Sequence, residues 1–168
     1  MEFFETLHAR QSVRAYQARA LEPEKIEAIL RAANAAPSAG NKQAYQIFAV
    51  QARAALQKLG DGRTYFDVLP LALVFCAHPA RSGERFGERG AKFYCVQDAT
   101  IACAYAQLAA TALGLASVWL GRFDEELVCR AIGAGDDLLP IAILAIGYAA
   151  ETPERKPRRT LDDLVKHV

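Results

Sequence analysis

The sequence predicts a fold in which helices alternate with buried strands. Four short apolar runs have the length and composition of buried strands, at residues 45–50, 71–76, 115–120 and 141–148. Segments with helical spacing of apolar residues separate these runs. The longest uncharged stretch, residues 99–121, is rich in strong helix formers. By itself this alternation indicates an α/β chain with a parallel sheet, because parallel strands need helical crossovers.

Three helices are predicted in the first part of the chain. Apolar residues from Phe3 onward have helical spacing, and this helix ends near Arg10. Pro23 opens the second helix at its first turn, where a missing N–H costs nothing, and the helix ends near Asn34. A third, short helix covers residues 52–59 and is ended by a glycine.

Residues 77–90 contain glycines, a proline and many charges, which predicts a mobile loop and a candidate lid. The long central helix is expected to begin within residues 91–97. Its uncharged part has apolar residues on all sides, so we expect burial on most sides until Gly114 ends the helix. The alternative for so long an uncharged run is a membrane-spanning helix. The alanine content, the polar Gln107 and the break at Gly114 favour the buried helix, whose small faces would also let a second copy approach closely.

Two further helices follow the central strand. Acidic residues at 124–126 suit a helix N-terminus, where the helix dipole favours negative charge. Near the end of the chain, Thr160 and Asp163 have the spacing of a capping box and predict a last helix over residues 161–167.

Composition limits the classes of function. The chain has 168 residues, 52% hydrophobic residues and a formal net charge of +1, which suits one domain with a real core and gives no overall attraction to nucleic acid or anionic membranes. Four cysteines without Cys-x-x-Cys spacing predict no metal site. The first residues lack the pattern of a signal peptide, so a cytoplasmic protein with reduced thiols is expected.

Three polar segments are candidates for ligand binding. Arg10, Ser12 and Arg14 alternate, so in an extended chain they point to one side and could hold a phosphate or carboxylate; the alternative is a solvated strand edge. The turn-rich loop at residues 35–43 offers donors to a ligand or is simply a helix-to-strand connection. The basic patch at residues 155–159 could contact nucleic acid, but no aromatic platform accompanies it.

Four blocks in this order resemble the FMN-dependent nitroreductase family in its short, minimal form. The blocks span nearly the whole chain: residues 10–16 (RQSVRAY), 36–43 (APSAGNKQ), 98–121, and Gly147-Tyr148 with 156–158 (KPR). The resemblance implies that residues 1–168 form a single α+β domain, with a central mainly antiparallel sheet flanked by helices around a long buried helix. It replaces the parallel sheet that alternation alone suggests. It also implies a homodimer with FMN at the interface, held by both subunits.

The resemblance assigns site residues as well. Arg10 and Ser12, with the adjacent Gln11, match the family's phosphate and ribityl site, joined by Lys156 and Arg158. Arg14 matches a basic residue near the pyrimidine edge of the flavin, where positive charge stabilises the reduced ring. The remaining matched residues are Pro37, Ser38, Ala39, Asn41 and Gln43 from the partner subunit, and Leu120 and Gly121 facing the reactive side of the ring.

The chain also departs from the family's usual pattern. Ala44-Tyr45 stands where Pro-Trp is frequent, and the long helical insertion that covers the pocket in larger members is missing. We therefore expect any cover to come from Tyr65-Phe66 or from residues 77–90.

The function that the resemblance implies is an FMN-dependent oxidoreductase. NAD(P)H would reduce FMN, and a nitroaromatic, quinone or similar electron-poor acceptor would then be reduced in ping-pong order. No catalytic side chain is assigned, because the cofactor carries the chemistry. The alternatives are a non-catalytic flavin-binding or sensing dimer, and a reductive dehalogenase or flavin-consuming enzyme on the same scaffold.

Overall fold

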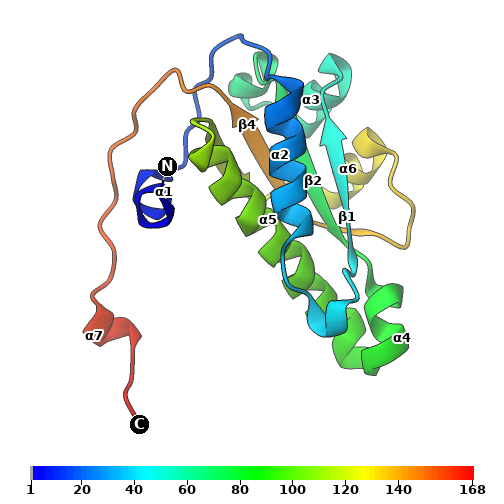
Figure 1. The fold of residues 1–168 in the computed structure, drawn as a ribbon. Coiled ribbons are helices and arrows are strands. Elements are labelled where there is room, and N and C mark those ends of the chain that lie inside the picture. Colours follow the sequence, from blue (N-terminus) through cyan, green and yellow to red (C-terminus); the bar gives the residue numbers. More distant parts are fainter. Residues whose placement is uncertain (1) are drawn as a thin grey trace.

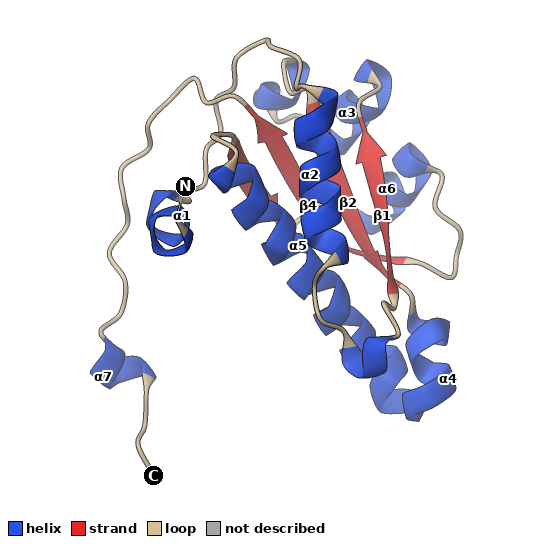
Figure 2. Cartoon of the chain, in the orientation of Figure 1, coloured by secondary structure: helices blue, strands red, loops and turns tan. Residues whose placement is uncertain are grey.

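Four antiparallel strands form the centre of the molecule in a computed structural model that describes residues 2–168 (Figures 1 and 2). The strands are β1 (Tyr45–Val50), β2 (Leu71–Ala77), β3 (Ala116–Leu120) and β4 (Leu139–Gly147). Their order in the sheet is β1-β2-β4-β3, and every neighbouring pair is antiparallel. The α+β architecture with an antiparallel sheet is therefore confirmed, and the parallel sheet suggested by alternation alone is wrong.

The directions of the strands explain this correction. Val50 at the end of β1 pairs with Ala72 near the start of β2, so the helical connection between them returns to the same end of the sheet. Likewise, Leu120 at the end of β3 pairs with Ile143 of β4. Strands β2 and β3 run in the same direction with β4 between them, and β1 and β4 run in the opposite direction. Alternation correctly indicates one helical crossover, from β2 to β3, but it does not reveal the strand inserted between the two.

Helices cover both faces of the sheet. On one face lie α2 (Pro23–Asn34) and α5 (Cys95–Ala112), which pack on a cluster that includes Phe75 and Leu144. On the other face lie α3 (Arg53–Gly60) and α6 (Glu125–Ile132), in a cluster with Ile143. Figure 1 shows these helix layers in front of and behind the strands. Because β2 is covered on both faces, each of its residues is buried.

The remaining helices lie around this centre. They are α1 (Phe3–Ala9), α4 (Pro79–Arg89) and α7 (Leu161–Leu164), with short 3₁₀ turns at Ala39–Asn41 and Thr64–Asp67. The predicted bounds of the helix at 23–34 and of the strand at 45–50 are met. The last helix is shorter than predicted: Thr160 Oγ1 accepts from the Asp163 N–H at 3.3 Å, but the helix stops at Leu164 in an exposed tail.

The predicted loop at residues 77–90 is wrong, because most of it forms helix α4. Pro79 occupies the first turn, and His78 Nδ1 accepts a hydrogen bond from the Arg81 N–H at 3.3 Å, which caps the helix. The arginines and glutamates of this segment are good helix formers despite its glycines. Gly87 interrupts the helix with φ +59°, and a π-helical turn over Gly90–Tyr94 then joins it to α5.

The uncharged central stretch is a buried helix followed by a strand. The apolar residues of α5 that have no exposed surface are four alanines, Cys95 and Cys103. In residues 2–168, no helix has the length and apolar content needed to cross a membrane.

The start of α2 is tied to the end of β4 by Tyr148. Its hydroxyl donates to Glu22 Oε2 at 2.6 Å and accepts from Lys25 Nζ at 2.8 Å. The Tyr148 hydrogen bond is the main cause that lowers the pKa of Glu22 from 4.5 to about 2. The ionised carboxylate is therefore favoured in the folded state, and 40% of the Glu22 side chain remains exposed.

This contact predicts a pH-dependent contribution to stability. Because the folded pKa of Glu22 is depressed, its contribution is present above pH 4.5 and is lost as the pH falls from 4.5 towards 2. We expect Glu22→Gln to lower the free energy of unfolding at pH 6, with the difference from wild type vanishing near pH 2, measured by urea denaturation. Glu24→Gln is the matched control, since Glu24 is an exposed acid of the same helix. A difference that does not vary with pH would contradict the assignment.

Candidate functional site

Residues 10–16 leave helix α1 and run beside the outer edge of β3. Ser12 forms a parallel bridge with Ser117, and the Val13 N–H donates to the Ser117 carbonyl at 3.0 Å. Val13 and Tyr16 point into the core, with 6% of each residue exposed. This places Ser12 and Arg14 on the side away from Val13, as the alternation predicts.

The two arginines of this segment have no partner within the chain. In residues 2–168, neither the Arg10 nor the Arg14 guanidinium takes part in an ion pair or a side-chain hydrogen bond. Arg14 is exposed and lies near Tyr65, where its charge and that of Arg63 partly offset the burial that raises the pKa of this tyrosine. Two unpartnered guanidiniums on one short segment suit an anionic ligand, because each offers a fork of donors.

Gln11 lies on the opposite side of the same segment. Its Oε1 is buried and accepts no hydrogen bond within the described residues. It lines a cavity of about 250 Å³ together with Thr111, Ser117 and Glu151. A buried carbonyl oxygen without a donor is costly, so this position suits a ligand that brings a hydroxyl or N–H group.

The end of β3 lies close to an arginine that sequence reasoning missed. Leu120 is the last residue of β3, and Gly121 directly after it is exposed. Arg63 Nη2 donates to the Arg122 carbonyl at 2.9 Å and so fixes the chain just beyond Gly121. Arg63 follows an Asp-Gly turn in the sequence, but nothing in that pattern indicates a contact with residues so distant in the chain.

The loop between α2 and β1 carries the second group of predicted site residues. Pro37 and Asn41 are exposed, while Ser38, Ala39 and Gln43 are half-buried. Ser38 Oγ accepts from the Gln43 N–H at 2.9 Å, and Gln43 Nε2 donates to Asn41 Oδ1 at 2.7 Å. The Ser38 hydroxyl proton is left for another acceptor, and so is part of the Asn41 amide.

Helix α4 supports this loop from outside. Arg85 Nη1 donates to the Gly40 carbonyl at 3.1 Å, and Lys42 Nζ lies 3.2 Å from Glu84 Oε2. A Cβ at Gly40 would lie 2.8 Å from the side-chain ends of Arg85 and Phe86, and the φ of +52° also favours glycine here. The segment predicted as a mobile lid is therefore a helix that packs against the loop and holds it in place. Of the other predicted cover, Tyr65-Phe66, only Tyr65 is half-buried, whereas Phe66 is 1% exposed and belongs to the core.

Lys156 and Arg158 lie on the extended tail that follows β4. Both are exposed, and neither forms an ion pair in residues 2–168. The tail passes helix α1, where Arg155 donates to the His8 carbonyl (Figure 1). A chain spans at most about 3.6 Å per residue, so the two cations follow within a short distance of this contact.

The two groups of predicted site residues are attached to opposite ends of α5. Asp98, near the start of α5, accepts hydrogen bonds from Ala39 and Ala44 on the loop. Gln107, towards its end, donates to Ser117 Oγ at 3.4 Å beside Ser12. With a rise of about 1.5 Å per residue, these attachments lie roughly 14 Å apart along the helix axis. The chain brings the residues of each group together, but the structure of one chain does not bring the groups together.

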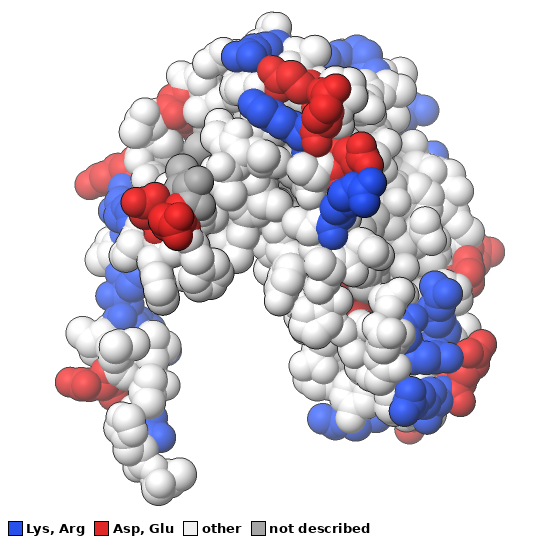
Figure 3. All heavy atoms as spheres, in the orientation of Figure 1, with Lys and Arg blue, Asp and Glu red and all other residues white. Residues whose placement is uncertain are grey.

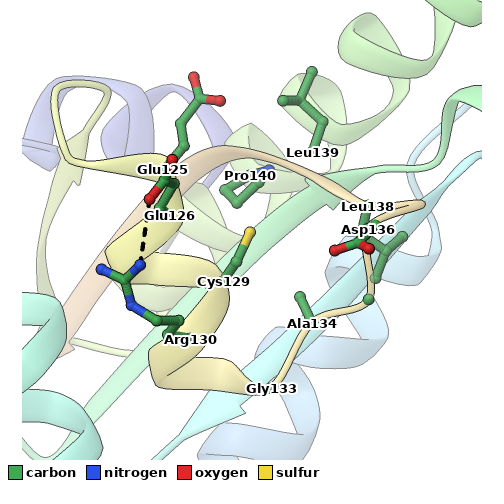
Figure 4. A pocket seen from close by; sticks show the side chains of 11 residues that line it. Glu125, Glu126, Cys129, Arg130, Gly133, Ala134, Asp136, Leu138, Leu139 and Pro140 are labelled. Carbon is green, nitrogen blue, oxygen red and sulfur yellow. Dashed lines mark hydrogen bonds and ion pairs between the residues drawn. The ribbon is translucent and has the colours of Figure 1, made fainter.

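A separate open pocket of about 560 Å³ lies between α6 and the start of β4 (Figure 4). Its lining includes Cys129 and the 3.3 Å ion pair of Glu126 with Arg130. Burial, together with the nearby acids Glu125 and Asp136, raises the pKa of the Cys129 thiol, which disfavours the reactive thiolate. None of the predicted site residues lines this pocket. The described residues contain no group of three or more His, Cys, Asp or Glu that could hold a metal ion.

Comparison with known proteins identifies the family. Residues 7–62 and 63–148 match the model of the Nitroreductase family. A protein of Archaeoglobus fulgidus with the provisional name NADH dehydrogenase/NAD(P)H nitroreductase is 34% identical over 154 residues, covering 88% of this chain and 85% of that protein. FMN reductase (NADPH) of Bacillus subtilis is 28% identical over 170 residues, covering 92% and 68%. The crystal structure of a nitroreductase family protein from Clostridium difficile 630 has a TM-score of 0.88 at 33% identity, covering 99% and 98%. The chain therefore belongs to the nitroreductase family.

Proposed function

We propose that this protein is an FMN-dependent oxidoreductase that uses NAD(P)H and works as a homodimer. The names of its relatives, which include FMN reductases and an NAD(P)H nitroreductase, support the reaction class. The observation that carries the proposal is the pair of guanidiniums, Arg10 and Arg14, that lack any partner in residues 2–168. FMN has a phosphate at one end and a ring that becomes anionic on reduction, so it needs two separate positive charges.

The phosphate end is assigned to Arg10, Ser12 and the tail cations Lys156 and Arg158. A guanidinium binds phosphate through two parallel hydrogen bonds, and the Ser12 hydroxyl adds a third donor. Gln11 lies on the opposite side of this segment, where its buried Oε1 lines a separate cavity, so it is not assigned to the same contact. Arg10, Ser12 and the tail cations thus fit the anionic end of FMN.

The ring is assigned to Arg14 and to backbone groups around Leu120 and Gly121. Exposure of Arg14 leaves its charge free to stabilise negative charge on the pyrimidine edge. Residues from the loop of a second chain complete the site: Pro37, Ser38, Ala39, Asn41 and Gln43.

Bound FMN would supply hydride transfer in ping-pong order, from NAD(P)H to an electron-poor acceptor such as a nitroaromatic or quinone. The protein's part is to bind, orient and supply charge. Burial raises the pKa of each thiol in the chain, to about 12 for Cys76, so none is suited to act as a nucleophile at neutral pH. No catalytic side chain is assigned.

A homodimer is supported by an uncharged stripe on α5. Ile101, Ala104, Tyr105 and Leu108 have the spacing of one helix face and remain partly or largely exposed in a single chain. If a twofold axis crosses α5, the helices of two copies run antiparallel, and the loop at the start of one meets residues 10–14 at the end of the other. This arrangement would join the two groups of site residues that one chain keeps apart.

Apolar side chains at both ends of the chain support the same assembly. On α1, 63% of Phe3 and 74% of Phe4 are exposed, and on the tail 74% of Leu161 is exposed. Figure 3 shows a wide hollow between the tail with α1 and the main body, bordered mostly by residues that are neither acidic nor basic. A second copy in this hollow would cover these side chains.

The test of the function is a visible spectrum of the purified protein after incubation with FMN and gel filtration. We expect a yellow protein that bleaches when NAD(P)H is added anaerobically and recolours when a quinone or nitroaromatic is added. A yellow protein that never bleaches would favour a non-catalytic flavin-binding or sensing dimer. Protein that retains no FMN would overturn the proposal. Bleaching that is reversed only by a halogenated substrate, or release of the reduced flavin itself, would favour the alternative enzymes on this scaffold.

A further inference from the structure

Asp98 is a buried carboxylate without a cation to balance it. It is 2% exposed and lies in the first turn of α5. No ion pair within residues 2–168 includes it. Burial of a charged group is costly unless it is well hydrogen-bonded, so the donors that Asp98 accepts from must stabilise it.

These donors are two backbone groups that bracket the loop between α2 and β1. Oδ1 accepts from the Ala39 N–H at 2.9 Å, and Oδ2 accepts from the Ala44 N–H at 3.3 Å. One side chain therefore holds both ends of the segment that contains Asn41 and Gln43. No other side chain hydrogen-bonds to both ends of this segment within the described residues.

The segment between these two contacts has an unfavourable backbone conformation. Gly40, Asn41 and Gln43 have φ values of +52°, +55° and +45°. Side-chain-bearing residues disfavour this left-handed region, and such conformations persist only where the surrounding contacts enforce them. The contact from Arg85 to Gly40 is on the exposed side, whereas Asp98 acts from the interior. The buried carboxylate is thus well placed to enforce the loop conformation.

We propose that Asp98 is a positioning residue for flavin binding, which fixes the 39–44 loop to the start of α5 without touching the cofactor. The inference rests on the proposed function, in which this loop contacts the FMN of the partner chain. Because α5 would also carry the dimer contact, Asp98 couples the position of the loop to the position of the interface. A loop freed from Asp98 would lose more conformational entropy when FMN binds, so the affinity for FMN would fall.

The test is Asp98→Asn in the full-length protein. The amide keeps the size of the side chain and one acceptor oxygen, but its NH₂ group cannot accept from a backbone N–H. We expect hydrogen exchange to speed up about tenfold or more at whichever of the Ala39 and Ala44 amides loses its acceptor, while Ala106 and Ala110 in α5 keep their protection. The Kd for FMN should rise about tenfold, and the visible circular dichroism of the bound flavin should change at full occupancy.

Asp136→Asn is the matched control, since Asp136 is an exposed aspartate whose side chain forms no hydrogen bond or ion pair within residues 2–168. It should leave the loop exchange rates, the Kd and the flavin spectrum unchanged. A purely structural role of Asp98 would lower the melting temperature but leave the Kd and the dichroism of the folded protein unaltered, and that result would overturn the proposal. Unchanged exchange at Ala39 and Ala44 would also overturn it. If the wild-type protein binds no FMN, the proposed function fails, and the exchange rates alone decide whether Asp98 holds the loop.

Discussion

Heterodimers that pair an Arg10→Ala chain with an Asn41→Asp chain are expected to bind one FMN with wild-type affinity. Each site in the proposed dimer combines Arg10 of one chain with Asn41 of the other. A heterodimer therefore has one site with both residues intact and one site with both defects. Each homodimeric variant has two defective sites. One site of the heterodimer regains wild-type affinity only if each FMN site is built from residues of both chains.

The size of the effect follows from the contacts removed. Loss of a hydrogen bond to a charged group costs about 1.5–3 kcal/mol, so the Arg10→Ala homodimer should bind FMN roughly 10- to 150-fold more weakly. Asn41→Asp keeps the acceptor used by Gln43 but replaces amide donors with a negative charge. The left-handed backbone at this position, φ +55°, tolerates aspartate.

The measurement is a flavin fluorescence titration of heterodimers purified with two affinity tags. We expect two phases, with half of the sites at the wild-type Kd. Heterodimers made from differently tagged wild-type chains are the control and should titrate in one phase. If each FMN site lies within one chain, every chain of the variant heterodimer carries a defect. The absence of a high-affinity phase would then contradict the shared site.

Leu144→Ala is expected to lower the free energy of unfolding by about 2–5 kcal/mol. Leu144 lies in the central strand β4, pairs with Leu73 of β2 and Trp119 of β3, and has no exposed surface. The substitution leaves a cavity beneath the helices that pack on this face of the sheet. Since globular proteins have a total stability of about 5–15 kcal/mol, the loss is a large fraction of the whole.

Chemical denaturation at one fixed protein concentration measures this effect, because dimerisation would otherwise alter the apparent stability. The control is Leu139→Ala, the same substitution at the start of the same strand, where the side chain is 37% exposed. We expect the control to cost less than about 1 kcal/mol. Equal losses for the two variants would show that burial at position 144 is not what stabilises the sheet.

Some features of the fold follow from the sequence because their causes are local. The strands at 45–50 and 71–77 are apolar runs bounded by turn residues. The helix at 23–34 begins at a proline, and the central helix ends just before Gly114. The alternation of residues 12–14 follows from an extended backbone. A local pattern can determine such elements, since each depends on the preferences of adjacent residues.

The helical conformation of residues 77–90 could be established only from the tertiary structure. A composition of glycines, a proline and charged residues is typical of a loop. The cap from His78 and the contact of Arg85 with Gly40 nevertheless favour a helix. Propensity alone does not include a partner distant in the chain. For the same reason, the sequence does not reveal the role of Asp98, which joins two backbone groups more than fifty residues earlier.

The sequence by itself determined most of the helices and strands of this protein and the family that its four blocks resemble. Only the tertiary structure decided the order and direction of the strands, because these depend on which end of the sheet each connection returns to. It also decided that Arg10 and Asn41 belong to groups attached at opposite ends of α5. Local chemistry determines which residues can bind an anion or form a loop, whereas long-range packing determines which of them can meet.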